Sequence, residues 1–326
     1  MNLGIVGGGA WGTALAQVAS AGGRETLLWA LEPEVVESIN LRSENPLFLP
    51  GISLNREVRA TANLNDLEVC DAWLVVTPAQ HMRAVLRVAS DWAKPLVLCS
   101  KGIEERSGEL LNRVAEESCP QAQIAVLSGP TFASEVAKGL PTAVTLAAED
   151  SDLAERLRDR LALPTFRIYV SDDVAGAEIG GAVKNVLAIA CGVVEGKGLG
   201  QNAGAALVAR GFAEMTRFGL AMGARADTLT GLSGLGDLVL TCSSTSSRNY
   251  SLGKGLGEGR SAAELLSDRK TVAEGAFTAP VLARLARDKG IDMPIVDAVD
   301  ALIAGSADVD QVLDALLSRP ARAEGV

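Results

Sequence analysis

The chain has 326 residues, of which 48% are hydrophobic and 21% are charged, close to the usage of ordinary globular proteins. This length is generous for one hydrophobic core and comfortable for two, so we expect two domains. A formal net charge of −10 argues against general nucleic-acid binding, although a few positioned cations could still hold an anionic substrate.

Cysteine usage and the lack of leader or anchor signals indicate the compartment. The five cysteines are widely spaced without a Cys-x-x-Cys pair, as is typical of reduced thiols in the cytoplasm. Because the chain has one histidine, His81, and no paired cysteines, we expect no metal site. No basic segment precedes the apolar N-terminus, and no uninterrupted apolar run reaches about 18 residues. We therefore expect a cytoplasmic protein without stable membrane insertion.

The first half alternates short apolar runs with segments of helical spacing. This alternation predicts right-handed βαβ units and a parallel sheet covered on both faces. The expected strands are Leu3–Val6, Glu25–Trp29, Trp73–Val76, Leu96–Ser100, Ile124–Ser128, Ala143–Ala147 and Thr165–Val170. The expected helices are Trp11–Ala21, Glu34–Asn40, Met82–Trp92, Gly108–Glu117 and Ser151–Ala162.

The pattern changes after Ser171, where Ala/Leu/Val-rich stretches of helical period alternate with glycine-rich breaks. The expected helices there are Asp173–Val194, Ala203–Met222, Ala279–Lys289 and Ile295–Ala304. The glycine-rich stretches Gly196–Gly204 and Gly253–Gly259 are most simply turns between helices. We therefore predict an α/β domain at residues 1–170, followed by an all-α domain at residues 171–326.

A glycine motif follows the first expected strand and opens a helical pattern. Gly7, Gly9 and Gly12 fit G-x-G-x-x-G, with Ala10 and Trp11 between the last two glycines. Such glycines allow a tight turn, close approach of the backbone to a pyrophosphate, and close packing of helix on strand. Strand, motif and helix in this order predict a Rossmann-like domain that binds a dinucleotide.

The end of the second expected strand bears on the choice of cofactor. Glu32 stands about 20 residues beyond the motif, where an acidic side chain binds ribose hydroxyls, although a solvated charge at a helix start fits equally. No cation stands at Ala30, Leu31 or Glu32 to meet a 2′-phosphate. Among NAD and NADP, this slightly favours NAD.

Further segments make the chain resemble bacterial NAD(P)-dependent glycerol-3-phosphate dehydrogenase along nearly its whole length. They are Ser100-Lys101-Gly102-Ile103-Glu104, Ser128-Gly129-Pro130-Thr131-Phe132-Ala133, Gly180-Gly181-Ala182-Val183-Lys184-Asn185, and Gly234-Leu235-Gly236-Asp237 running on to Ser247-Arg248-Asn249. The resemblance implies an oxidoreductase that interconverts glycerol 3-phosphate and dihydroxyacetone phosphate by hydride transfer with NAD(P). It also implies that the glycerol 3-phosphate is used for phospholipid synthesis.

The resemblance also assigns roles. It makes Lys184 the general acid/base, and burial among small apolar residues would lower the pKa of such a lysine. It places Lys101, Gly129, Thr131, Lys184, Asn185, Asp237, Ser247, Arg248 and Asn249 at the substrate. It places Gly7, Gly9, Ala10, Trp11, Gly12, Leu31, Glu32, Lys101, Ala133, Arg248, Val272 and Glu274 at the cofactor. Leu31 departs from the pattern, because many bacterial members carry Arg or His there.

Local sequence leaves other interpretations open. Asp237 could cap a helix, and Ser247-Arg248-Asn249 could be a hydrophilic loop instead of a phosphate clamp. A lysine-dependent dehydrogenase of the 6-phosphogluconate or β-hydroxyacid type is the nearest alternative enzyme, and a regulator that senses NADH without turnover is an alternative of another class. The sequence does not set the oligomeric state, and a homodimer stays open.

Overall fold

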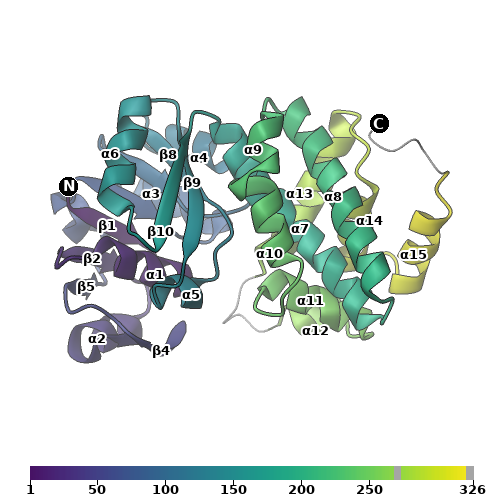
Figure 1. Ribbon diagram of the computed structural model, residues 1–326, viewed down its shortest axis with the longest axis horizontal. Helices are drawn as coiled ribbons and strands as arrows, with labels where there is room; N and C mark the ends of the chain where they lie inside the picture. The colour runs from purple at the N-terminus through teal and green to yellow at the C-terminus, as the bar shows by residue number, and fades with distance from the viewer. Residues whose placement is uncertain (268–272, 321–326) are drawn as a thin grey trace. The chain divides into compact units, whose positions relative to one another are not determined.

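Among the residues that the computed structural model describes, 1–267 and 273–320, an eight-stranded sheet forms the centre of the N-terminal part (Figure 1). Its strand order is β10-β9-β8-β7-β6-β1-β2-β5. The strands are β1 (Leu3–Val6), β2 (Thr26–Trp29), β5 (Val58–Thr61), β6 (Ala72–Val75), β7 (Leu96–Leu98), β8 (Ile124–Ser128), β9 (Thr142–Ala148) and β10 (Phe166–Ser171).

Strand direction divides the sheet into two groups. The strands from β8 to β5 run parallel, so their carboxyl ends meet at one edge. β9 pairs with β8 antiparallel, and β10 pairs with β9 parallel. The link from β8 to β9 contains only the short helix α5 (Ala133–Ala137), whereas longer helices connect other neighbouring strands. The fully parallel arrangement that we expected is therefore wrong at this one pairing.

Successive side chains of the strands point to opposite faces of this sheet, and both faces are buried. In β1, Leu3 and Ile5 pack into one core, while Val6 packs into the core on the opposite face with Val75 and Leu98. Such two-sided burial explains why these strands read as continuous apolar runs. The predicted α/β architecture of the N-terminal part is confirmed.

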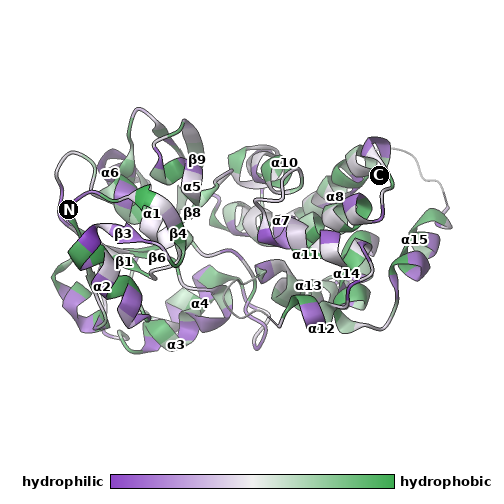
Figure 2. Ribbon diagram, turned by 90° about the horizontal axis from the view of Figure 1, so that it is seen from below, coloured by the Kyte–Doolittle hydropathy of each residue, from purple (hydrophilic) through white to green (hydrophobic). Residues whose placement is uncertain are grey.

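Helices and short elements cover both faces of the sheet. They are α1 (Ala10–Ala19), α2 (Pro33–Arg42), α3 (Met82–Arg87), α4 (Leu111–Ser118), α6 (Ser151–Leu161) and the 3-10 helices η1 (Leu64–Val69) and η2 (Ala79–His81). A small antiparallel pair joins β3 (Glu44–Asn45) and β4 (Leu49–Ser53). In Figure 2, α2 and α3 alternate between hydrophilic and hydrophobic segments, as amphipathic helices on a sheet do.

The C-terminal part is largely helical, as predicted. Its helices are α7 (Val174–Gly196), α8 (Gln201–Ala221), α9 (Ala226–Thr230), the π-helix η3 (Leu232–Gly236), α10 (Asp237–Thr241), α11 (Arg248–Gly257), α12 (Ala262–Leu265), α13 (Glu274–Asp288), α14 (Pro294–Ala304) and α15 (Val309–Leu317). α7 is long and apolar enough to cross a membrane, yet its apolar stretch is fully buried within the chain. It is therefore the core helix of this part.

Residue contacts divide the chain into two compact units. The first unit holds residues 1–100 and 111–177, and the second holds residues 101–110 and 178–326. The domain boundary that we placed after residue 170 lies just before α7, whose first residues count with the first unit. The short segment Lys101–Leu110 leaves the sheet and packs with the helical unit.

Candidate active site

The glycine motif forms a tight turn between β1 and α1. Gly7 has φ +128, a backbone conformation that residues with a side chain rarely adopt. A Cβ on Gly12 would lie 1.9 Å from the Gly7 carbonyl oxygen. A Cβ on Gly9 would meet nothing within 4 Å, so protein packing does not require that glycine. Open space at Gly9, and the absence of an acidic residue from the first turn of α1, fit a pyrophosphate.

Asn45 supports this turn, and sequence reasoning missed it. Its buried Nδ2 donates to the Gly8 carbonyl oxygen at 2.9 Å and to Thr13 Oγ1 at 2.8 Å. Asn45 thus ties β3 to both ends of the glycine turn. No local signal in the sequence marks this role, because the contact joins segments more than thirty positions apart.

The remaining expected cofactor residues of the first unit lie beside the same sheet edge or just after it. Ala10 and Trp11 open α1, and Leu31 and Glu32 follow β2, the neighbour of β1. Leu31 is 74% exposed, and Glu32 is the N-cap residue of α2 without a side-chain cap bond. Both residues thus follow the carboxyl end of β2, the edge at which ligands of such sheets bind.

The Ser-Gly-Pro-Thr turn follows β8, whose carboxyl end lies at this edge too. Gly129 has φ +156, and a Cβ there would lie 2.9 Å from Val144 Cα. Thr131 Oγ1 donates to the Gly129 carbonyl oxygen at 3.3 Å, and Ala133 begins α5. The glycine is therefore needed for close packing against β9, and its turn presents Thr131 beyond the strand end.

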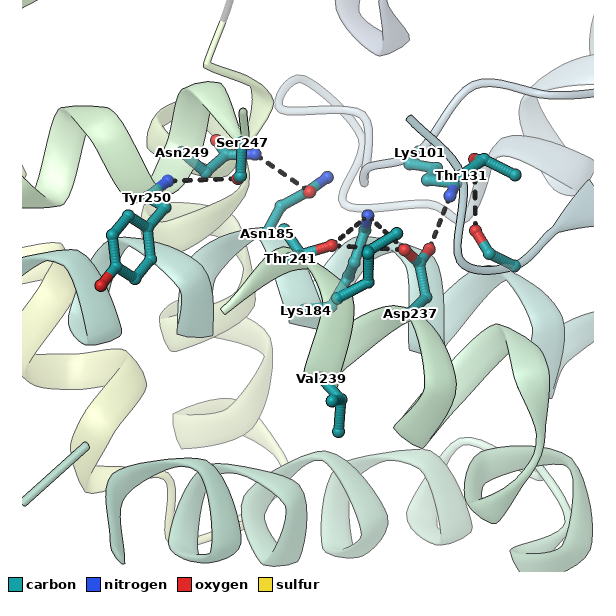
Figure 3. A network of polar contacts seen from close by, with 12 residues as sticks. Lys101, Thr131, Lys184, Asn185, Asp237, Val239, Thr241, Ser247, Asn249 and Tyr250 are labelled. Carbon is teal, nitrogen blue, oxygen red and sulfur yellow. Dashed lines mark hydrogen bonds and ion pairs between the residues drawn. The ribbon is translucent and has the colours of Figure 1, made fainter. Parts of the chain in front are cut away.

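In the second unit, Lys184 is buried in the middle of α7, with 7% of its surface exposed. Its Nζ donates to Asp237 Oδ1 at 2.7 Å and to Thr241 Oγ1 at 2.8 Å (Figure 3). Burial lowers the pKa of Lys184 from 10.5 to about 8; Asp237 opposes this shift, and Lys101 adds to it. Lys184 is thus poised to exchange a proton near neutral pH.

Asp237 holds a second lysine as well. Its side chain is fully buried, and its Oδ2 accepts from Lys101 Nζ at 2.6 Å. One carboxylate thus lies between two ammonium groups, which supply the counter-charge that a buried carboxylate requires. The interpretation of Asp237 as only a helix cap is therefore insufficient, although it is the first residue of α10.

Thr241 completes this cluster, and the sequence analysis gave it no role. Its Oγ1 also donates to Asp237 Oδ1 at 3.3 Å. The spacing of four residues on α10 places Asp237 and Thr241 on one helical face, which was the available signal.

Asn185 follows Lys184 on α7, and its amide contacts the side chain of Asn249. Asn249 Nδ2 donates to Asn185 Oδ1 at 3.0 Å, and Asn249 Oδ1 accepts from the Gly275 backbone N–H at 2.9 Å. These contacts join α7, α11 and α13. Gly275 is a further residue that the sequence analysis did not identify.

Ser247 and Arg248 mark the start of α11 and not a loop. Ser247 is the N-cap residue, whose Oγ accepts from the Tyr250 backbone N–H at 3.2 Å. Arg248 is the first residue of the helix and is exposed. Partial desolvation lowers its pKa, and the charge of Glu274, the first residue of α13, opposes that shift. Val272, the other expected cofactor residue of that segment, lies outside the described residues.

The second unit therefore brings together Lys101, Lys184 and Asp237 in one cluster and Asn185 with Asn249 in another. The expected residues of the first unit follow its parallel strands at their carboxyl ends.

Comparison with known proteins identifies the family. Family models described as the N-terminus and the C-terminus of NAD-dependent glycerol-3-phosphate dehydrogenase match residues 2–154 and 173–314. A protein of Erythrobacter litoralis named glycerol-3-phosphate dehydrogenase NAD(P)+ is 63% identical over 323 residues, which cover 99% of this chain and 98% of the relative. One of the same name from Novosphingobium aromaticivorans is 64% identical over 324 residues, with the same coverage.

Solved structures agree with the sequence comparison. The glycerol-3-phosphate dehydrogenase of Coxiella burnetii has a TM-score of 0.93 and 37% identity, covering 98% of this chain and 99% of that one. The glycerol-3-phosphate dehydrogenase of Saccharomyces cerevisiae has a TM-score of 0.82 and 28% identity, covering 96% of this chain and 98% of that one. This chain therefore belongs to the NAD-dependent glycerol-3-phosphate dehydrogenase family.

Proposed function

We propose that this chain interconverts glycerol 3-phosphate and dihydroxyacetone phosphate with NAD(P), and that Lys184 carries the proton. The observation behind this assignment is a buried ammonium group, held by Asp237 and Thr241, whose pKa lies at about 8. When bound, the nicotinamide supplies or accepts the hydride at substrate C2.

Lys184 acts on the oxygen at C2. In the direction of ketone reduction, Nζ of the ammonium form donates a proton to the oxygen that becomes the hydroxyl. In the direction of alcohol oxidation, the neutral amine removes that proton. A pKa of about 8 keeps both forms accessible near neutral pH, which suits a reversible reaction.

Lys101 and Asp237 have electrostatic roles. The charge of Lys101 favours negative charge that develops on the substrate oxygen. The carboxylate of Asp237 holds the ammonium groups of Lys101 and Lys184 in place and limits their mutual repulsion. Both lysines therefore remain ordered before the substrate arrives.

Arg248 is the proposed phosphate ligand, because a guanidinium binds phosphate oxygens in a bidentate manner. Its position at the first turn of α11 adds the favourable field of a helix N-terminus. Ser247 and Asn249 flank it, and the turn of Gly129 and Thr131 supplies further polar groups for substrate oxygens. These assignments follow the family pattern, as does that of Asn185.

The cofactor lies on the glycine turn in this proposal. Gly7, Gly9, Ala10, Trp11 and Gly12 hold the pyrophosphate, and Leu31 and Glu32 line the ribose. Ala133, Lys101, Arg248, Val272 and Glu274 complete the set by family pattern. The relatives above are named for NAD(P)+, and the uncharged Leu31 favours NAD in this chain.

The cellular role follows from the product. Glycerol 3-phosphate would enter phospholipid synthesis, and the five free, buried thiols agree with a reducing cytoplasm. We propose that the enzyme is cytoplasmic and that it could form a homodimer.

The test is steady-state oxidation of NADH and NADPH with dihydroxyacetone phosphate beside a set of 2-oxo and 3-oxo acids. Oxo acids are the relevant competitors, because a lysine-dependent dehydrogenase of the β-hydroxyacid type is the nearest alternative enzyme. Turnover of an oxo acid alone would remove the proposed substrate.

Replacing the proton carrier separates the enzyme from a sensor of NADH. We expect Lys184→Ala to lower kcat by about 100-fold or more while NADH still binds, as expected for loss of a general acid. Near-normal turnover in Lys184→Ala would remove Lys184 from the mechanism. The absence of turnover in the natural chain, with NADH bound, would favour the sensor.

A further inference from the structure

The amide of Asn185 is oriented by a chain of hydrogen bonds that begins at a backbone nitrogen. Gly275 N–H, in the first turn of α13, donates to Asn249 Oδ1 at 2.9 Å. A backbone nitrogen is always a donor, so the atom that faces it must be the oxygen of the Asn249 amide. This contact decides which way the Asn249 amide points, a choice that side-chain shape alone leaves open.

The orientation of the Asn249 amide in turn fixes that of Asn185. With its oxygen on Gly275, Asn249 turns Nδ2 toward Asn185, whose Oδ1 accepts at 3.0 Å. The nitrogen end of Asn185 then points away from Asn249 (Figure 3). Asn185 and Asn249 are 5% and 8% exposed, so little water can replace either bond. Turning the Asn185 amide over would bring two buried NH2 groups against each other.

The fit around Gly275 keeps this chain of bonds short. A Cβ at position 275 would lie 2.5 Å from the Asn185 backbone oxygen and 2.9 Å from Asn249 Oδ1. Ala273, the N-cap residue of α13, provides no side-chain cap. Asn249, from α11, therefore accepts a hydrogen bond from one of the free N–H groups in the first turn of α13. The positive end of α13 also polarises the two amides in series, which makes the Asn185 N–H groups stronger donors.

We propose that Asn249 is a positioning residue, which locks Asn185 as a hydrogen-bond donor to a substrate oxygen through the relay Gly275–Asn249–Asn185. This assignment rests on the proposed function for the identity of the substrate. It makes Asn185, which the family resemblance placed at the substrate, specifically a hydrogen-bond donor. It also changes the expected role of the Asn249 side chain, because both ends of that amide are bound within the protein and Asn185 makes the contact with the substrate.

The test is a double-mutant cycle on dihydroxyacetone phosphate reduction. Asn249→Asp keeps an acceptor for Gly275 but removes the donor to Asn185, and Asn249→Ala removes both without adding charge. In the natural background we expect each change to lower kcat/KM by about 3- to 10-fold, as for the loss of one hydrogen bond between neutral groups. In an Asn185→Ala background we expect Asn249→Ala to have an effect of less than about 2-fold, because the relay has lost its end.

Asn249→Asp in the Asn185→Ala background measures the effect of its added charge alone. If Asn249→Ala lowers kcat/KM equally in both backgrounds, Asn249 acts on the substrate or the fold by itself, and the relay is wrong. Single variants with normal kcat/KM would overturn it as well.

A readout without substrate keeps the relay separate from the proposed function. With selective 15N-asparagine labelling, the side-chain NH2 signals of Asn185 and Asn249 are each assigned by their loss in the alanine variants. We expect the Asn185 signal to move in Asn249→Asp, while thermal unfolding is retained. If the signal moves but dihydroxyacetone phosphate is not turned over, the proposed substrate is wrong and the relay stands. If the signal does not move, the relay is wrong and the proposed substrate is unaffected.

Discussion

Lys184 experiences opposing effects that can be separated in the structure. Burial disfavours its charge, and so does Lys101, while the Asp237 carboxylate favours it. Burial is the largest of these effects, so the net result is a pKa of about 8 and not the 10.5 of a free lysine. The two directions of the reaction need opposite protonation forms of Lys184, so their rates should respond oppositely to pH.

We expect kcat/KM for dihydroxyacetone phosphate reduction to fall as pH rises through about 8, because the reaction needs the ammonium form of Lys184. For glycerol 3-phosphate oxidation, kcat/KM should rise through the same pH, since the neutral amine is then required. Initial rates between pH 6 and pH 10 in both directions check this. Two profiles with the same sign would contradict Lys184 as the shared proton carrier.

Leu31 offers a test of cofactor choice. It is exposed beyond β2 and carries no charge for a 2′-phosphate. We expect Leu31→Arg to raise the ratio of kcat/KM for NADPH to that for NADH by about 10-fold, as for one charge-assisted contact. Leu31→Gln, of similar length and uncharged, is the control and should leave the ratio near its starting value. An unchanged ratio in Leu31→Arg would place the adenosine ribose elsewhere.

Sequence reasoning found those site residues whose chemistry is visible locally. Lys184 stands among small apolar residues, and the glycine motif follows an apolar strand. Asn45 and Gly275 were missed because each acts through a contact formed only on folding. Thr241 was missed although its spacing from Asp237 was a local signal. No residue near Asn45 in sequence indicates that it will bind a glycine turn more than thirty positions away.

At the scale of elements, apolar strands were predicted well and strands with polar or proline residues were not. β1 and β8 have the expected bounds, while β3, β4 and β5 were missed because polar side chains or proline break their apolar pattern. The stretch Gly253–Gly259, expected as a turn, largely belongs to α11, and that prediction was wrong.

Close packing of two helices explains these glycines. A Cβ on Gly253 would lie 1.9 Å from the Ile189 carbonyl oxygen, and one on Gly192 would lie 2.0 Å from the Tyr250 carbonyl oxygen. α7 and α11 therefore touch backbone to backbone, which only glycine allows. Packing thus outweighs the weak helix propensity of glycine, a balance that local sequence does not show.

We expect Gly253→Ala to destabilise the chain by about 1–3 kcal/mol, because the helices must move apart to admit the methyl group. Gly204→Ala is the matched control: Gly204 lies inside α8 with nothing within 4 Å of an added Cβ. That change should be neutral or stabilise by up to about 1 kcal/mol through helix propensity. Urea unfolding followed by circular dichroism measures both. Equal effects would show that the α7–α11 contact is looser than described.

At the scale of the whole molecule, one buried carboxylate links stability to pH. Glu214 on α8 is 2% exposed, and its oxygens accept from the Ile295 and Val296 backbone N–H groups at the start of α14. Burial raises the pKa of Glu214 to about 7; these two bonds and Arg217 oppose the shift, and Asp292 adds to it.

Because the folded chain holds this proton more tightly than the unfolded chain, stability should fall as pH rises through about 7. Between pH 5.5 and pH 8 we expect Glu214 to lower the free energy of unfolding by about 2 kcal/mol. Glu214→Gln, which does not titrate, should lack this component. Unfolding free energies of the two proteins across this range give the difference. Parallel curves would show that Glu214 is ionised throughout.

The passage of Lys101–Leu110 into the helical unit has a consequence for dissecting the chain. The polypeptide passes from one unit to the other after Ser100, after Leu110 and after Ala177. A fragment ending at residue 170 would carry Lys101 without the Asp237 that binds it, and the complementary fragment would carry Asp237 without Lys101. Likewise, hybrids of two homologues joined near residue 170 would take their two lysines from different parents. Lys101, Lys184 and Asp237 therefore come from one parent only when the whole chain does.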